Sequence, residues 1–225
     1  TYCFVYVHNS KGSAIANAYL GIGSDDGCKV WWNGSLAGSF VDGRAVSADA
    51  NFWGPITINA GWNKLLVKVE NGTTGHGVYA RFANANRTAL TDKAFLSFYT
   101  TDSTAPGSPQ NLLAAGAVSG AWQNTVSSPT FTWTSGTDAQ GSSEGVSGVR
   151  GQKVYFGANG AAAPYTFQSA LSFSPGSLAS GTYFFKVATV DYALNESAPA
   201  SFAFMLDNTP PAGVTMGFGS VTADS

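Results

Sequence analysis

The stretch Lys64-Leu65-Leu66-Val67-Lys68-Val69-Glu70 decides the fold class, because apolar and polar side chains alternate along it. In an extended strand, successive side chains point to opposite faces of the sheet, so Leu65, Val67 and Val69 share one face and the residues between them share the other. The stretch therefore predicts a strand with one buried face and one face toward water.

Strand-forming segments of this kind recur along the chain. Asn71-Gly72 directly follows the strand predicted at Lys64–Glu70, and Gly77–Phe82 comes next. This order predicts a hairpin or tight loop between two strands. No long window has a helical period, and at most a short helical turn lies between Ala85 and Ala94. We therefore predict an all-β fold of tandem β-sandwiches. The other candidate strands, rich in aromatic or β-branched residues, are Tyr2–His8, Cys28–Trp32, Thr130–Thr134, Gln152–Phe156, Thr182–Asp191 and Ser201–Leu206.

Composition excludes several classes of protein. The chain has 225 residues, only 11% of them charged, and a formal net charge of −2 without any run of like charges. Nucleic-acid binders carry clustered positive charge, so we expect no nucleic acid as a partner. The longest apolar stretches, such as Phe202–Leu206, are far shorter than a bilayer span, so we expect no membrane insertion. This composition indicates a β-rich protein that is extracellular or on the cell surface.

Two similar proline-containing linkers divide the chain. Asp102-Ser-Thr-Ala-Pro-Gly107 and Asp207-Asn-Thr-Pro-Pro-Ala-Gly213 begin with aspartates 105 positions apart, which is the size of one sandwich domain. Proline restricts itself and its predecessor to extended conformations, as suits an inter-domain joint. We predict domains at 1–101 and 102–208, with 209–225 starting a further domain or forming a disordered tail. No signal peptide is observable at the start of this sequence, and we expect it to be a piece of a longer chain with neighbouring domains.

Two motifs in the first domain carry a resemblance. They are Leu20-Gly-Ile-Gly-Ser-Asp-Asp-Gly-Cys-Lys-Val-Trp-Trp-Asn-Gly34, with an acidic turn between strands, and Ala60-Gly-Trp-Asn-Lys-Leu-Leu-Val-Lys-Val-Glu-Asn-Gly72. Together they resemble the galactose-binding-like, jelly-roll β-sandwich modules of secreted bacterial proteins. The resemblance covers most of residues 1–100 and implies a jelly-roll-like domain that binds a polysaccharide or a cell-surface glycan.

The middle of the chain has a resemblance of its own. The segments Thr130-Phe-Thr-Trp-Thr134, Gly181-Thr-Tyr-Phe-Phe-Lys-Val-Ala-Thr-Val-Asp191 and Ala193-Leu-Asn-Glu-Ser197 resemble bacterial Ig-like or fibronectin type III-like domains. This resemblance covers nearly all of residues 105–208. It implies an Ig-like domain that acts as a spacer and carries out no chemistry.

Asp25 and Asp26 form the acidic pair best suited to an ion. Ca²⁺ needs six to eight oxygen ligands, and two carboxylates on a turn, with backbone carbonyls and Asn33 or Glu70, supply part of that shell. The alternative is an Asx turn, in which each carboxylate accepts hydrogen bonds from nearby backbone N–H groups. Apart from this calcium, the sequence indicates no cofactor.

Aromatic and amide side chains of the first domain are candidates for sugar binding. Alternation places Trp32 on the core face with Val30, which leaves Trp31 on the opposite face. Trp53 lies beside Gly54 and Pro55, so we expect it in an exposed loop. His76 occupies a position where similar modules often carry tryptophan. The candidate ligand-binding residues are Trp31, Trp53, His76 and Asn71.

Cys3 and Cys28 leave two alternatives open. Alternation places both on core faces, where they form one disulfide or remain buried thiols.

The acids, bases and nucleophiles form no convergent catalytic set, so we expect no catalytic residues and no enzyme activity, unless the chain is an accessory fragment of a larger secreted hydrolase. The function predicted is a non-catalytic extracellular carbohydrate-binding module with an Ig-like spacer. The alternative is a structural or adhesive component of a cell-surface layer, appendage or stalk.

Overall fold

The computed structural model describes residues 1–72, 75, 77–141 and 143–213. These residues form two compact units. The first unit comprises 1–107, 137–150 and 190–196, and the second comprises 108–136, 151–189 and the residues from Ser197 onward. The segments 137–150 and 190–196 thus pack with the first unit, although they follow the first linker in sequence. The domain boundaries at 101 and 208 stay predictions, and most of the predicted piece 209–225 lies outside the described residues.

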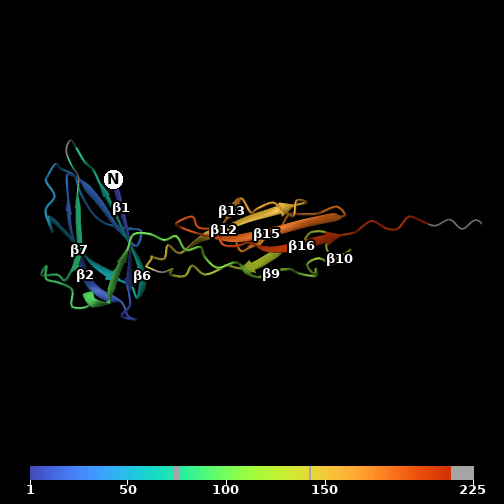
Figure 1. The fold of residues 1–225 in the computed structure, drawn as a ribbon, viewed down its shortest axis with the longest axis horizontal. Coiled ribbons are helices and arrows are strands. Elements are labelled where there is room, and N and C mark those ends of the chain that lie inside the picture. Colours follow the sequence, from blue (N-terminus) through green and yellow to red (C-terminus); the bar gives the residue numbers. More distant parts are fainter. Residues whose placement is uncertain (73–74, 76, 142, 214–225) are drawn as a thin grey trace, which may run out of the picture. The chain divides into compact units, whose positions relative to one another are not determined.

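The first unit is a sandwich of two antiparallel sheets. One sheet has five strands in the order β4-β3-β6-β1-β8, and the other has three in the order β5-β2-β7. Figure 1 labels β1, β2, β6 and β7 in this unit. The strands are β1 (Tyr2–Asn9), β2 (Ile15–Ser24), β3 (Cys28–Trp32), β4 (Ser35–Phe40), β5 (Asn51–Ile58), β6 (Gly61–Val69), β7 (Val78–Ala83) and β8 (Leu96–Tyr99).

The core of the first unit lies between these sheets and follows the predicted alternation. Leu65, Val67 and Val69 of β6 are buried, and they pack with Leu20 and Ile22 of β2 in the facing sheet. Both sheets therefore contribute to one apolar core, which is the property that defines a sandwich.

A buried tryptophan also links the two sheets. Trp32 of β3 is buried, as predicted, and its indole Nε1 donates a 2.8 Å hydrogen bond to the carbonyl of Thr57 in β5. Because β5 belongs to the opposite sheet, this bond satisfies the buried indole N–H while it ties the two layers together.

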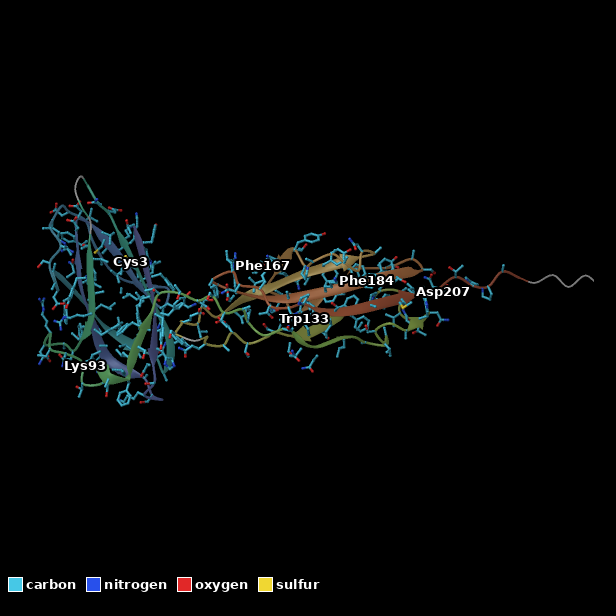
Figure 2. All side chains as sticks on the ribbon, in the orientation of Figure 1. Cys3, Lys93, Trp133, Phe167, Phe184 and Asp207 are labelled. Atoms are coloured by element: carbon cyan, nitrogen blue, oxygen red, sulfur yellow. The ribbon has the colours of Figure 1, made fainter. Side chains whose placement is uncertain are left out.

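The two cysteines do not form a disulfide. Both are free thiols, Cys28 buried and Cys3 partly buried (Cys3 is labelled in Figure 2). The physical reason is their placement in the sheet: β1 and β3 lie on opposite sides of β6, where Cys3 is opposite Val67 and Cys28 is opposite Val69. Two strand spacings separate their Cα atoms by roughly 9 Å or more, beyond the roughly 7 Å limit for a disulfide. Of the two alternatives, the structure contains free thiols, and only that of Cys28 is fully buried.

The second unit is also a sandwich. One sheet has the order β10-β16-β15-β12-β13 and the other has the order β14-β11-β9. Apart from the short β10, the unit has seven strands. In sequence order, strands one, two and five (β9, β11 and β14) form one sheet, and the other four (β12, β13, β15 and β16) form the second sheet, which is an Ig-like arrangement. Figure 1 shows β15 beside β12 and β16. The strands are β9 (Gln110–Ala114), β10 (Trp122–Gln123), β11 (Phe131–Thr134), β12 (Val149–Gly157), β13 (Thr166–Gln168), β14 (Ser172–Phe173), β15 (Gly181–Asp191) and β16 (Ala200–Leu206).

Aromatic rings fill the core of the second unit. Phe131 of β11 is fully buried, and its ring centroid lies 4.5 Å from that of Phe185, 5.6 Å from that of Phe202 and 6.1 Å from that of Phe204. Trp133 is buried in the same core and is labelled in Figure 2. The two rings that β11 supplies therefore pack on rings from β15 and β16 of the other sheet.

The all-β prediction is confirmed for the described residues. All eight strands proposed from sequence are present, with ends that differ by up to three residues. The 3-10 helix η1 (Lys93–Phe95) overlaps the end of the segment Ala85–Ala94, in which at most a short helical turn was expected. Among the helices of the described residues, none is long and apolar enough to cross a membrane.

The aromatic core gives a prediction about stability. Replacing Phe131 with alanine leaves a cavity among the rings of Phe156, Phe185, Phe202 and Phe204, so Phe131→Ala is expected to lower the free energy of unfolding of the second unit by about 3–5 kcal/mol. Chemical denaturation followed by circular dichroism measures this loss. Val118→Ala is the matched control, because Val118 is 72% exposed and its truncation is expected to change stability by less than about 0.5 kcal/mol. Equal losses in the two variants would contradict this packing.

Candidate functional site

The outer face of the five-stranded sheet carries a row of apolar side chains across three strands. The strand register aligns Phe4 of β1 with Leu66 of β6, and Leu66 in turn with Trp31 of β3. Alternation sends Cys3, Val5 and Val7 of β1 and Val30 of β3 into the core, so this row points outward. The prediction that Trp31 lies opposite the core face is in accord with this register.

The row lies next to further exposed aromatic surface. Tyr2 is 65% exposed and Phe4 is 36% exposed, while Trp31 and Leu66 are half-buried. A depression of about 230 Å³ is lined by Phe4, Trp31, Gly34, Lys64 and Leu66. We call Tyr2, Phe4, Trp31 and Leu66 the aromatic face. Apolar side chains gathered in this way on a surface mark an interaction site more often than scattered ones do.

Lysines flank the aromatic face. Lys29 and Lys68 are paired across β3 and β6, and Tyr2 is paired with Lys68 on the other side. The Lys68 ammonium lies 3.0 Å from the Glu70 carboxylate. The hydrogen bond from Lys68 lowers the pKa of Glu70 and raises the pKa of Lys68, so both stay charged near neutral pH. The face thus combines flat rings with fixed charges and hydrogen-bond donors at one end.

Sequence reasoning missed Tyr2, Phe4 and Leu66 as parts of this face. The signal was present, because placing Cys3 and Val5 on the core face implies that Tyr2 and Phe4 point the other way. The sequence does not show which strands lie side by side. In the sheet, Leu66 of β6 is paired with Phe4 on one side and with Trp31 on the other.

Trp53 occupies a different environment from the exposed loop expected for it. It belongs to strand β5 and is half-buried against the core of the first unit. Its indole covers Gly38 of β4 so closely that a Cβ atom on Gly38 would lie 2.2 Å from the ring. Because it packs in this way against β4, Trp53 offers less free ring surface than a loop residue would.

The turn at Asp25 and Asp26 is held by backbone hydrogen bonds. Asp26 has a left-handed backbone with φ of 58°, and its Oδ1 accepts a 3.1 Å hydrogen bond from the Arg44 N–H. Its Oδ2 accepts a 2.5 Å hydrogen bond from the Gly72 N–H. One carboxylate thus accepts hydrogen bonds from loops 18 and 46 residues away, whereas an Asx turn binds the N–H of a nearby residue. Calcium at Asp25 and Asp26 stays a prediction.

Asn71 lines a different depression from the one that Trp31 lines. Asn71 is exposed and lines an open depression of about 410 Å³ together with Asp26, Asp42 and Glu70. His76 lies outside the described residues. The structure therefore brings Asn71 and Asp26 together, and it places Trp31 and Trp53 elsewhere.

Comparisons with known proteins identify no family for this chain. No protein-family model matches the sequence, and no curated protein matches it. Among solved structures, the central fibronectin-III array of RIM-binding protein is 17% identical, with 82% of this chain and 58% of that chain covered and a TM-score of 0.27. The fibronectin(III)-like modules of Clostridium thermocellum CbhA are 12% identical, with 80% and 77% covered and a TM-score of 0.30.

A β-1,2-glucanase from Parabacteroides distasonis is 10% identical, with 92% of this chain but only 28% of that chain covered and a TM-score of 0.28. The chain thus spans 58% of the first of these structures and little more than a quarter of the glucanase. With TM-scores this low, the likenesses carry no argument about function, and the assignment to β-sandwiches rests on strand pairing and burial.

The Asp26 hydrogen bonds give a second prediction. Asp26→Ala removes both acceptors and places a β-carbon without a polar partner at positive φ, so we expect the first unit to lose about 1–3 kcal/mol of stability. Asp26→Asn keeps one acceptor oxygen and tolerates this φ, so its loss is expected to be smaller. Thermal melting of both variants without added metal measures the difference. Equal melting temperatures for Asp26→Ala and the unmodified protein would contradict the role of these bonds.

Proposed function

We propose that this chain is a non-catalytic module of an extracellular or cell-surface protein, in which a galactose-binding-like β-sandwich binds carbohydrate and an Ig-like or fibronectin type III-like sandwich acts as a spacer. The observation that carries the proposal is the aromatic face, with Trp31 and Phe4 aligned through Leu66 on the outside of one sheet. The expected partner is a polysaccharide or a cell-surface glycan.

The chemistry of the aromatic face suits a sugar. A pyranose ring has an apolar side of C–H groups that stacks on indole and phenyl rings, and its hydroxyls need polar partners at the edge. Trp31, Phe4 and Tyr2 provide the rings, and Lys29 and Lys68 provide donors beside them. A sheet holds its side chains on strands that are paired on both sides, which limits the entropy lost on binding an extended chain.

Two further features support this arrangement. The first unit has eight strands in sheets of five and three, as a jelly-roll sandwich with eight strands would. The second unit has an Ig-like strand order with an aromatic core, which suits a rigid spacer. The low share of charged residues favours an extracellular setting for both.

The test is binding of the whole chain to a glycan array and to insoluble polysaccharides such as cellulose and chitin. We expect Trp31→Ala to weaken binding about ten-fold or more, because aromatic anchors dominate contact energies. Phe4→Ala is expected to weaken it less, and Trp53→Ala is the matched control because Trp53 packs against Gly38. Thermal melting of each variant separates loss of binding from loss of fold.

Two outcomes would contradict the proposal. If Trp53→Ala loses binding and Trp31→Ala keeps it, sugar binds away from the aromatic face. If the unmodified chain binds no glycan across plant, algal and bacterial sets, the structural or adhesive alternative replaces carbohydrate binding.

A further inference from the structure

Three aspartates from distant parts of the chain meet within the first compact unit. Asp102 begins the first linker, Asp138 lies in the loop between β11 and β12, and Asp191 is the last residue of β15. One carboxylate oxygen from each lies within 4.8 Å of one from each of the others. The Asp191 side chain is fully buried, and the other two are partly buried. We call these three residues the aspartate cluster.

Protein donors fix the orientation of each carboxylate in the aspartate cluster. Asp102 Oδ2 accepts a 2.6 Å hydrogen bond from the Ser147 N–H, and Asp138 Oδ2 accepts a 2.5 Å bond from the Gly148 N–H. Both oxygens of Asp191 accept 2.8 Å bonds from Asn195, one from its backbone N–H and one from its Nδ2. Hydrogen bonds of this kind orient carboxylates, as they do around a metal ion.

Two oxygens of the aspartate cluster have no hydrogen-bond partner among the described residues. Asp102 Oδ1 and Asp138 Oδ1 each expose less than 1 Å² and accept no hydrogen bond from that part of the chain. Buried polar atoms are nearly always hydrogen-bonded, because leaving one unsatisfied is costly. Two such oxygens, beside a third carboxylate that is itself fully buried, point to a ligand that is positively charged or a donor.

A lysine near the aspartate cluster supplies only part of the opposite charge. The Lys64 ammonium interacts electrostatically with Asp138 and Asp102, but it donates its short hydrogen bond to the Ser147 carbonyl and lies 4.7 Å from the centre of the Tyr192 ring. Burial has the largest effect on Lys64 and lowers its pKa. One lysine against three carboxylates leaves an excess of negative charge.

We propose that Asp102, Asp138 and Asp191 together bind one calcium ion. All three supply hard carboxylate oxygens, which suit Ca²⁺, whereas Zn²⁺ favours nitrogen and sulfur ligands. Mg²⁺ demands near-ideal octahedral geometry and usually takes one or two carboxylates. Ca²⁺ accepts six to eight oxygens in flexible geometry, so backbone carbonyls and waters complete its shell. The ion holds the linker residue Asp102 to the loop of Asp138 and to the end of β15.

This site differs from the turn at Asp25 and Asp26, and it does not depend on carbohydrate binding. Asp26→Asn is therefore a matched control: it removes one negative charge from the other acidic candidate and leaves the aspartate cluster intact. Asp138→Asn is the test variant, because it keeps the size of the side chain and removes its charge. Asp102→Asn is a second test variant in case Asp138→Asn does not fold.

The experiment uses the whole chain after treatment with a chelator that is then removed. Isothermal titration with calcium chloride is expected to show one site, and saturating calcium is expected to raise the melting temperature by several degrees, because binding to the native state alone stabilises it. Asp138→Asn and Asp102→Asn are expected to weaken calcium binding at least 100-fold. Asp26→Asn is expected to keep both the affinity and the shift in melting temperature.

Several results would overturn the proposal. One is the absence of both a calcium titration signal and a shift in melting temperature for the unmodified chain. Another is calcium binding that is lost in Asp26→Asn and kept in Asp138→Asn, which would assign the ion to the turn. Equal affinity for magnesium and calcium would overturn the assignment of the metal. If neither test variant folds, the titration and melting of the unmodified chain decide the outcome.

Discussion

The alternation of side chains along β6 is the constraint on which the first unit depends. β6 lies between β1 and β3, so its register fixes what both neighbours present to each face of the sheet. Its odd-numbered residues Leu65, Val67 and Val69 fill the core, and Leu66 between them joins Phe4 and Trp31 on the outside. A slip of one residue would exchange the two faces. The packing of the core and the position of the aromatic face are therefore one arrangement.

Much of the fold follows from sequence where strands alternate strongly or carry aromatic rings. β3 was predicted with its observed ends, and β15 was predicted to within one residue. β4 (Ser35–Phe40) and β5 (Asn51–Ile58) were missed, because Gly, Ser, Asn and Pro dilute their strand signal. Both are edge strands in their sheets, where a proline such as Pro55 is tolerated because the missing N–H need not pair. Trp53 was expected in a loop for the same reason.

What sequence could not supply is which segments become neighbours. Alternation correctly placed Cys3 and Cys28 on core faces, but only the strand order shows that β6 separates them. Asp102 was visible as the first residue of a linker, and Asp191 as the end of a strand. No local sequence pattern links either aspartate to Asp138, because the three residues come together only when the chain folds. Sites built from long-range contacts depend on the topology, and this holds also for Asp26, whose carboxylate accepts hydrogen bonds from Arg44 and Gly72.

The aspartate cluster imposes an electrostatic demand that the fold must meet. At an effective dielectric constant of about 20, two unit charges 4.8 Å apart repel by about 3 kcal/mol, and three carboxylates contain three such pairs. The total is comparable to the whole stability of a typical domain, about 5–15 kcal/mol. Burial raises the pKa of Asp138, and the charges of Asp102 and Asp191 raise it further. Lys64 offsets part of the repulsion from a position where it donates to a carbonyl. A divalent cation would offset more of it, because it brings two charges and contacts the unpartnered oxygens directly. The cluster therefore combines buried, oriented and unsatisfied oxygens in the way that a calcium site requires.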